Sequence, residues 1–137
     1  MRRLFAYGTL MCPEIIREVS GITQPGQPAV LWGFARYRVR GEHYPAITAE
    51  AGARVEGLLY DCADTDAWRR LDLFEGDMYL RAEVQVELAD GSYCMAGTYV
   101  IHPAHLDCLE HSHWDFEEFL RTGKTAFAAD YTGFNTF

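Results

Sequence analysis

The most regular pattern in this sequence lies in residues 81–101, RAEVQVELADGSYCMAGTYVI. Over residues 82–88 every second side chain is apolar, and those between are charged or polar. Because side chains alternate between the two faces of a strand, one face of this strand is buried and the other is in water. Asp90-Gly91 is a typical hairpin turn and leads into a second strand within residues 92–101. The stretch predicts an antiparallel pair with one wet face.

Three further strands are predicted upstream of this hairpin. Residues 3–7 form a short apolar run, and residues 29–39 and 54–60 are rich in aromatic and β-branched side chains. Gly57 lies inside the last of these strands, where glycine indicates either a bend of the barrel or the close approach of a neighbouring backbone or ligand. The bend is the preferred interpretation.

Two short helices interrupt the strands. The first, PEIIREV, has Pro13 at its first helical position and ends at Gly21. The second begins after a cap at Asp64 or Thr65 and stops at Gly76. Its apolar residues recur every third position and form one stripe, made by Trp68, Leu71 and Phe74.

Length and element order together predict the fold class. Antiparallel strands with two short helices predict an α+β fold, a small mixed, largely antiparallel β-barrel with short flanking helices. A chain of 137 residues with 49% hydrophobic content has enough apolar surface for one core. We therefore expect a single domain over residues 1–137, with residues 102–137 as a C-terminal helical and aromatic extension.

Composition excludes several classes of partner. The net charge is −8, and no run of Lys or Arg exceeds two residues. A nucleic-acid backbone or an anionic membrane would be repelled by such a protein. No leader-like segment or membrane-spanning apolar run is present, so we expect a cytoplasmic protein. Free thiols are expected for the four widely spaced cysteines, Cys12, Cys62, Cys94 and Cys108.

The first strand stops abruptly at Tyr7-Gly8-Thr9-Leu10. Successive backbone N–H groups in such a loop can hold an anion, and Gly8 allows another group to come close because it has no Cβ. Taken alone, the stretch favours an ordinary turn after a strand.

The end of the second helix carries two acidic residues, Asp72 and Glu75. They are three positions apart and share a helix face. Near apolar surface, the pKa of Glu75 would rise toward the range in which a carboxyl group transfers protons, and a neighbouring Asp72 charge would raise it further. On this evidence alone, a surface glutamate in water is the preferred interpretation, because glutamate at a helix end is ordinary.

Four stretches considered together carry a family resemblance: FAYGTL, YPAI, GLLY and LDLFEGDMYLR. In this order and spacing they resemble the gamma-glutamylcyclotransferase-like family, which includes gamma-glutamylamine cyclotransferases and plant avirulence-induced proteins. The resemblance covers residues 4–101 and implies a small mixed barrel whose cavity binds a gamma-glutamyl group.

The resemblance also implies roles for particular residues. Main-chain groups of Tyr7, Gly8, Thr9 and Leu10 would hold the glutamyl end of the substrate, and Tyr79 would lie near the pocket. Glu75 matches the catalytic glutamate. Asp72 and Arg81 match recurrent positions as well; we interpret Asp72 as support for the helix and Arg81 as structural.

The implied reaction is an intramolecular aminolysis of a gamma-glutamyl amine or peptide. It gives 5-oxoproline and a free amine, with Glu75 as general acid/base, and needs no metal, nucleotide or redox cofactor. The loop amides would bind either the substrate carboxylate or the developing oxyanion. The alternative is a barrel of the same family that binds a small molecule or a protein without turnover.

The last third of the sequence offers two further patterns. Four histidines, His102, His105, His111 and His113, lie near Asp107 and Glu110 in a predicted polar connection. They suggest either a metal site or solvated side chains, and their spacing favours the latter. A helix is expected to start at Ser112. The aromatic segment after it, with Phe127, Tyr131, Phe134 and Phe137, would pack on the barrel or form a homodimer contact, and packing on the barrel is the preferred interpretation.

Overall fold

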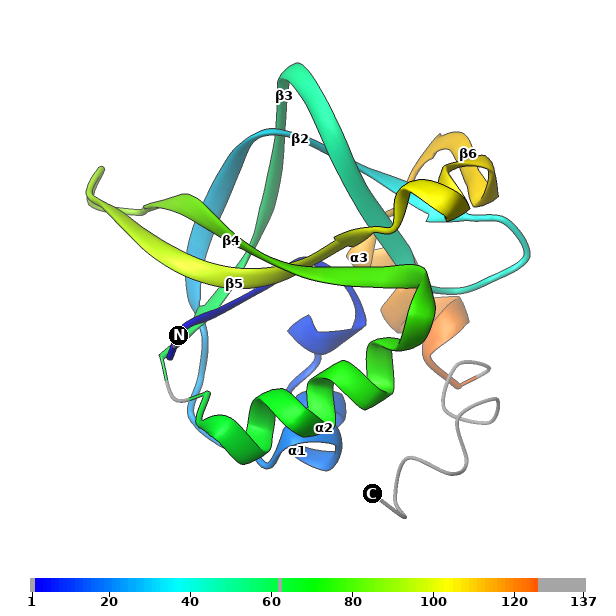
Figure 1. Cartoon of the computed structure of the whole chain (residues 1–137). Helices are drawn as coiled ribbons and strands as arrows, with labels where there is room; N and C mark the ends of the chain where they lie inside the picture. The colour runs from blue at the N-terminus through cyan, green and yellow to red at the C-terminus, as the bar shows by residue number, and fades with distance from the viewer. Residues whose placement is uncertain (1, 62, 126–137) are drawn as a thin grey trace.

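Five strands close into a barrel in the computed structural model, which describes residues 2–61 and 63–125 (Figure 1). The strands of the structure are β1 (Leu4–Ala6), β2 (Gln27–Val39), β3 (Pro45–Tyr60), β4 (Tyr79–Leu88), β5 (Tyr93–Ile101) and β6 (Leu109–His113). Their order is β3-β1-β5-β4-β2, the β2–β3 pairing closes the ring, and β6 adds to β2 outside it. Only the β1–β5 pair is parallel among the described strands. The predicted mixed, largely antiparallel barrel is confirmed.

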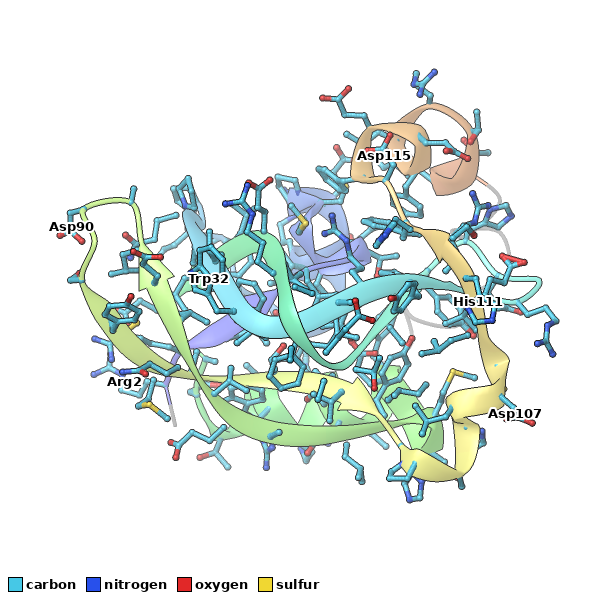
Figure 2. The ribbon with its side chains drawn as sticks, turned by 90° about the horizontal axis from the view of Figure 1, so that it is seen from above. Arg2, Trp32, Asp90, Asp107, His111 and Asp115 are labelled. Carbon is cyan, nitrogen blue, oxygen red and sulfur yellow. The ribbon has the colours of Figure 1, made fainter. Side chains whose placement is uncertain are left out.

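The hairpin predicted from residues 81–101 is formed by β4 and β5. Its register runs from Tyr79 opposite Ile101 to Glu87 opposite Tyr93. The apolar side chains of the alternating pattern turn inward, with Val86 fully buried. Figure 2 shows Asp90 at the tip of this hairpin, far from the C-terminal segment.

Strand β3 is much longer than predicted. The prediction gave residues 54–60, whereas β3 begins at Pro45 and pairs with β2 along nearly its whole length. Residues 45–53 contain few strong strand formers, so pairing with β2 determines their conformation. At Gly57 the Ala6 carbonyl occupies the place of a Cβ, which makes close approach of a neighbouring backbone, rather than a bend alone, the reason for glycine there.

Helices α1 (Pro13–Ser20) and α2 (Thr65–Glu75) lie side by side at one end of the barrel (Figure 1). Both follow the predicted boundaries. Gly21 ends α1 with φ at 82°, and the Asp64 side chain caps α2 by accepting a hydrogen bond from the Ala67 amide. Within the described residues, no helix is long and apolar enough to cross a membrane.

The segment after β5 differs from the prediction. The predicted polar connection is instead a turn of 3-10 helix, η3 (Pro103–Cys108), followed by β6. Strand β6 is short and polar, and it takes its conformation from the exposed edge of β2. Figure 2 shows Asp107, His111 and Asp115 following one another along this side of the barrel.

Two more short turns follow β6: α3 (Phe116–Glu118) and η4 (Phe119–Gly123). The cap of α3 is Asp115, whose side chain accepts from the Glu117 amide, and not Ser112 as predicted. The predicted aromatic contact of residues 127–137 lies outside the described residues.

Candidate active site

One hollow at the helical end of the barrel brings together every residue that the resemblance assigned to the site. Tyr7–Leu10, Glu75 and Tyr79 all line it. The other lining residues come from β1, from β5, from the start of β3 with the residue before it, and from the end of α2 with the turn after it. They include Tyr44, Pro45, Phe74, Met78 and Tyr99. Its cavity volume of about 60 Å³ has room for several water molecules or for one end of a small compound.

The loop after β1 lines this hollow. It turns into a short 3-10 helix, η1 (Thr9–Met11), whose first two residues are buried. Within residues 2–61 and 63–125, the amides of Gly8, Thr9 and Leu10 donate no hydrogen bond to another backbone or side-chain group. Buried amides without an acceptor are rare in proteins. Three successive ones at a hollow can hold a carboxylate or an oxyanion.

Gly8 is the residue at which another element packs most tightly against this loop. A Cβ on Gly8 would lie 2.7 Å from Cγ and 2.8 Å from Cδ of Pro45. The proline ring cannot move aside as a flexible side chain can. The close approach expected at Gly8 is therefore made by the first residue of β3, which fixes the loop against that strand.

Glu75 is the last residue of α2 and is half-buried at the hollow. Gly76 ends the helix directly after it, with φ at 73°, a value that residues with a Cβ atom rarely adopt. In the part of the chain that the structure describes, the Glu75 carboxylate has no hydrogen-bond or ion-pair partner. Loss of hydration, and then the negative charge of Asp72, raise its pKa to about 8. A carboxyl group with this pKa can both take up and release a proton near neutral pH.

Asp72, which raises the pKa of Glu75, does not itself line the hollow. Its carboxylate accepts a 2.6 Å hydrogen bond from the Tyr99 hydroxyl and lies 3.7 Å from the Arg81 guanidinium. Arg81 in turn stacks over the Trp68 ring, 4.8 Å from its centre. Asp72 thus ties α2 to β4 and β5.

Three tyrosines build the walls. The Tyr7 hydroxyl donates to the Tyr99 carbonyl at 2.6 Å, and the Tyr79 hydroxyl donates to the Pro45 carbonyl at 2.8 Å. Burial and the nearby Glu75 charge raise the pKa of Tyr7. For Tyr99, burial and the bond to Asp72 raise the pKa. Both phenols stay neutral at neutral pH. The sequence did not predict that Tyr99 lines the hollow, because its position within a predicted strand was the only information the sequence offered there.

Two histidines of the C-terminal segment, His102 and His113, make local contacts. His102 accepts from the Ala104 amide at 3.0 Å, and His113 stacks on Tyr37 with ring centres 5.2 Å apart. Among the residues that the structure describes, no three His, Cys, Asp or Glu side chains gather as metal ligands would. Cys12, Cys94 and Cys108 are free thiols.

The closed barrel with this hollow at its helical end defines a gamma-glutamyl cyclotransferase-like fold. The family model "Gamma-glutamyl cyclotransferase, AIG2-like" matches residues 4–116. The chain belongs to this family, as its motifs predicted.

Individual relatives agree with this assignment. AIG2-like protein A of Arabidopsis thaliana is 33% identical over 129 residues, which are 93% of this chain and 77% of that protein. The solution structure of another Arabidopsis thaliana protein has a TM-score of 0.70 at 26% identity, covering 96% of this chain and 79% of that one. A structure of a gamma-glutamyl cyclotransferase has a TM-score of 0.62 at 21% identity, covering 73% and 66%, which is a likeness of fold.

Proposed function

We propose that this protein is a gamma-glutamyl cyclotransferase that converts a gamma-glutamyl amine or peptide into 5-oxoproline and a free amine. The observation that carries the proposal is the pairing, in one hollow, of unbonded loop amides with the unpartnered Glu75 carboxylate. Family membership supports the same reaction. A site that only bound an anion would gain nothing from a carboxylate beside its amides.

The reaction needs the substrate folded back on itself. The loop amides hold an oxygen of the glutamyl group, so that the α-amine lies against its own γ-carbonyl, and this proximity lowers the entropic part of the barrier. The amine attacks the γ-carbon, a C–N bond closes the five-membered ring, and the bond to the departing amine breaks.

Glu75 carries the proton in this scheme. An α-amino group has a pKa of about 8 and is largely protonated at neutral pH, which makes it a poor nucleophile. Ionised Glu75 takes one proton from the ammonium group and gives it to the departing nitrogen as its bond to the γ-carbon breaks. The regenerated carboxylate then removes the second proton from the ring nitrogen and passes it to the free amine, which leaves as an ammonium ion. Two protons are moved in turn, and no other reactant is needed.

The test is production of 5-oxoproline from a panel of gamma-glutamyl amino acids, gamma-glutamyl amines and glutathione. We expect at least one compound to be converted with stoichiometric release of its amine. Absence of product over the whole panel, with binding still detectable, would favour the non-catalytic barrel instead.

Asp72→Asn is expected to shift the pH profile of turnover. Because ionised Glu75 is the base, kcat/KM rises with pH through the pKa of Glu75, which the Asp72 charge raises. Removing the Asp72 charge lowers the pKa of Glu75. The midpoint of the rise of kcat/KM with pH should therefore move to lower pH by roughly half a pH unit or more. The new amide oxygen can still accept from the Tyr99 hydroxyl, and Asp66→Asn on the exposed side of α2 is the matched control. A midpoint that stays in place or moves up would contradict the assignment.

The remaining expectations concern compartment and partners. We propose the cytoplasm, since three free thiols suit a reducing compartment. The partner is the small-molecule substrate, and no nucleic acid or membrane contact is proposed.

A further inference from the structure

Arg36 is a charged side chain that reaches from β2 to the end of β1. Its Nη1 donates to the Tyr7 carbonyl at 2.6 Å and to the Glu56 carbonyl at 3.2 Å. Tyr7 is the residue directly after β1, where the loop of the hollow begins, and Glu56 lies on β3. Arg36 therefore fastens the start of that loop to the barrel wall.

The C-terminal segment holds Arg36 in this position. The guanidinium lies 5.3 Å from the centre of the Trp114 ring, and a cation stacked on an indole face is stabilised by the ring quadrupole. Trp114 is 5% exposed, and its Nε1 donates to the His43 carbonyl at 2.8 Å.

Carboxylates balance the charge of Arg36. Burial lowers the pKa of Arg36, and the charges of Asp115 and Glu56 act in the opposite direction. Figure 2 shows Asp115 at the start of α3, the turn that follows Trp114. Arginine remains protonated in such surroundings, so the loop is held by a cation.

The bond to the Tyr7 carbonyl has a consequence for the next residue. That carbonyl and the Gly8 N–H belong to the same peptide unit, and none of the described peptide bonds is cis. In a trans peptide the C=O and N–H point in opposite directions. A cation fixed on the oxygen side thus aims the N–H away from Arg36. A charge-assisted bond to the oxygen also polarises the unit and strengthens its N–H as a donor.

We propose that Arg36 is a positioning residue of the substrate site: it fixes the Tyr7–Gly8 peptide so that the Gly8 N–H is presented to an anionic oxygen bound in the hollow. The identity of that oxygen as part of a gamma-glutamyl compound rests on the proposed function. The alignment itself is a property of the free protein and can be measured without turnover.

The experiment follows the Gly8 amide by ¹H–¹⁵N NMR in the wild type, Arg36→Met and Arg36→Lys, before and during titration with L-glutamate. In Arg36→Met the Gly8 ¹⁵N resonance should move upfield, because the polarising bond to the preceding carbonyl is lost, and glutamate should bind about fivefold to tenfold more weakly. Arg36→Lys keeps a cationic donor and should fall between the two.

Arg54→Met is the matched control. Arg54 also stacks on a tryptophan, 5.5 Å from the centre of the Trp32 ring, but on the outer surface of the barrel, where Figure 2 shows Trp32. Loss of this stack should leave the Gly8 resonance and the glutamate affinity as in the wild type. Arg54→Met therefore shows what the loss of a stacked arginine does when no bond to the loop is lost.

Several results would overturn the proposal. One is a folded Arg36→Met protein whose Gly8 resonance and glutamate affinity match those of Arg54→Met. If circular dichroism shows that Arg36→Met does not fold, Arg36→Lys decides, and an unchanged Gly8 resonance and affinity there overturn it. A wild type that binds glutamate at Gly8 but makes no 5-oxoproline would refute the proposed function, while the Arg36 comparison stands on the binding data.

Discussion

Glu75→Gln is expected to reduce the rate of 5-oxoproline formation by at least about a hundredfold, the usual contribution of a positioned general acid/base. Glutamine has nearly the same size and cannot carry the proton. Since the loop amides are untouched, affinity for the substrate should remain close to that of the wild type. Steady-state kinetics and direct binding of the substrate measure the two effects separately.

The same variant should become more stable than the wild type as the pH rises. The pKa of Glu75 in the folded protein, about 8, lies above its ordinary value of 4.5. In the unfolded chain Glu75 therefore ionises at a lower pH than in the folded protein. The wild type loses stability as the pH rises from the ordinary pKa of 4.5 through the folded-state pKa of about 8. The Glu75→Gln variant has no ionising group at this position and does not lose stability in this way. Because the residue is half-buried, we expect a gain on the order of 2 kcal/mol at pH 8, less than the full shift would give.

Glu83→Gln, on the exposed face of β4, provides the control for both measurements. It should change neither turnover nor the pH dependence of stability. Turnover by Glu75→Gln within a few-fold of the wild type would refute the role of this carboxyl group. Equal stability curves would show that the carboxyl group is hydrated.

Gly8→Ala is expected to impair the site through packing. The added methyl group would meet the Pro45 ring at 2.7 Å, and overpacking of this kind costs about 1–3 kcal/mol. The loop must move away from β3 to relieve the contact, and its amides then leave their positions. We expect a rise in KM of about tenfold or more, together with a lower melting temperature.

A second substitution tests this explanation. In the double variant Gly8→Ala/Pro45→Ala the ring carbons that cause the clash are gone. Stability and KM should therefore return toward those of Pro45→Ala alone, giving a coupling between the two sites. Additive effects in this cycle would mean that Gly8 matters for a reason other than its contact with Pro45.

Local rules were sufficient for those elements whose sequence signals act over short distances. The alternation in residues 81–101, the turn at Asp90-Gly91 and the caps of both helices need only neighbours along the chain. The site residues came from the motif resemblance, and the structure places them around one hollow.

Other features depend on partners far along the chain. Residues 45–53 become a strand because β2 lies beside them, and β6 forms on the edge of the same strand. Arg36 reads as an ordinary charged residue of a strand, since its contact with Tyr7 joins positions 29 residues apart. No spacing rule within one element could reveal that contact.

Under the proposed mechanism, the position of Glu75 on the final turn of α2 makes the length of that helix matter for turnover. Each residue of an α-helix advances the chain by about 1.5 Å and rotates it by about 100°. One residue inserted between the Asp64 cap and Glu75 would swing the carboxyl group around the helix axis, out of the hollow. Surface loops such as the β4–β5 tip generally tolerate inserted residues. Between the Asp64 cap and Glu75, by contrast, the number of residues sets the direction of the carboxyl group.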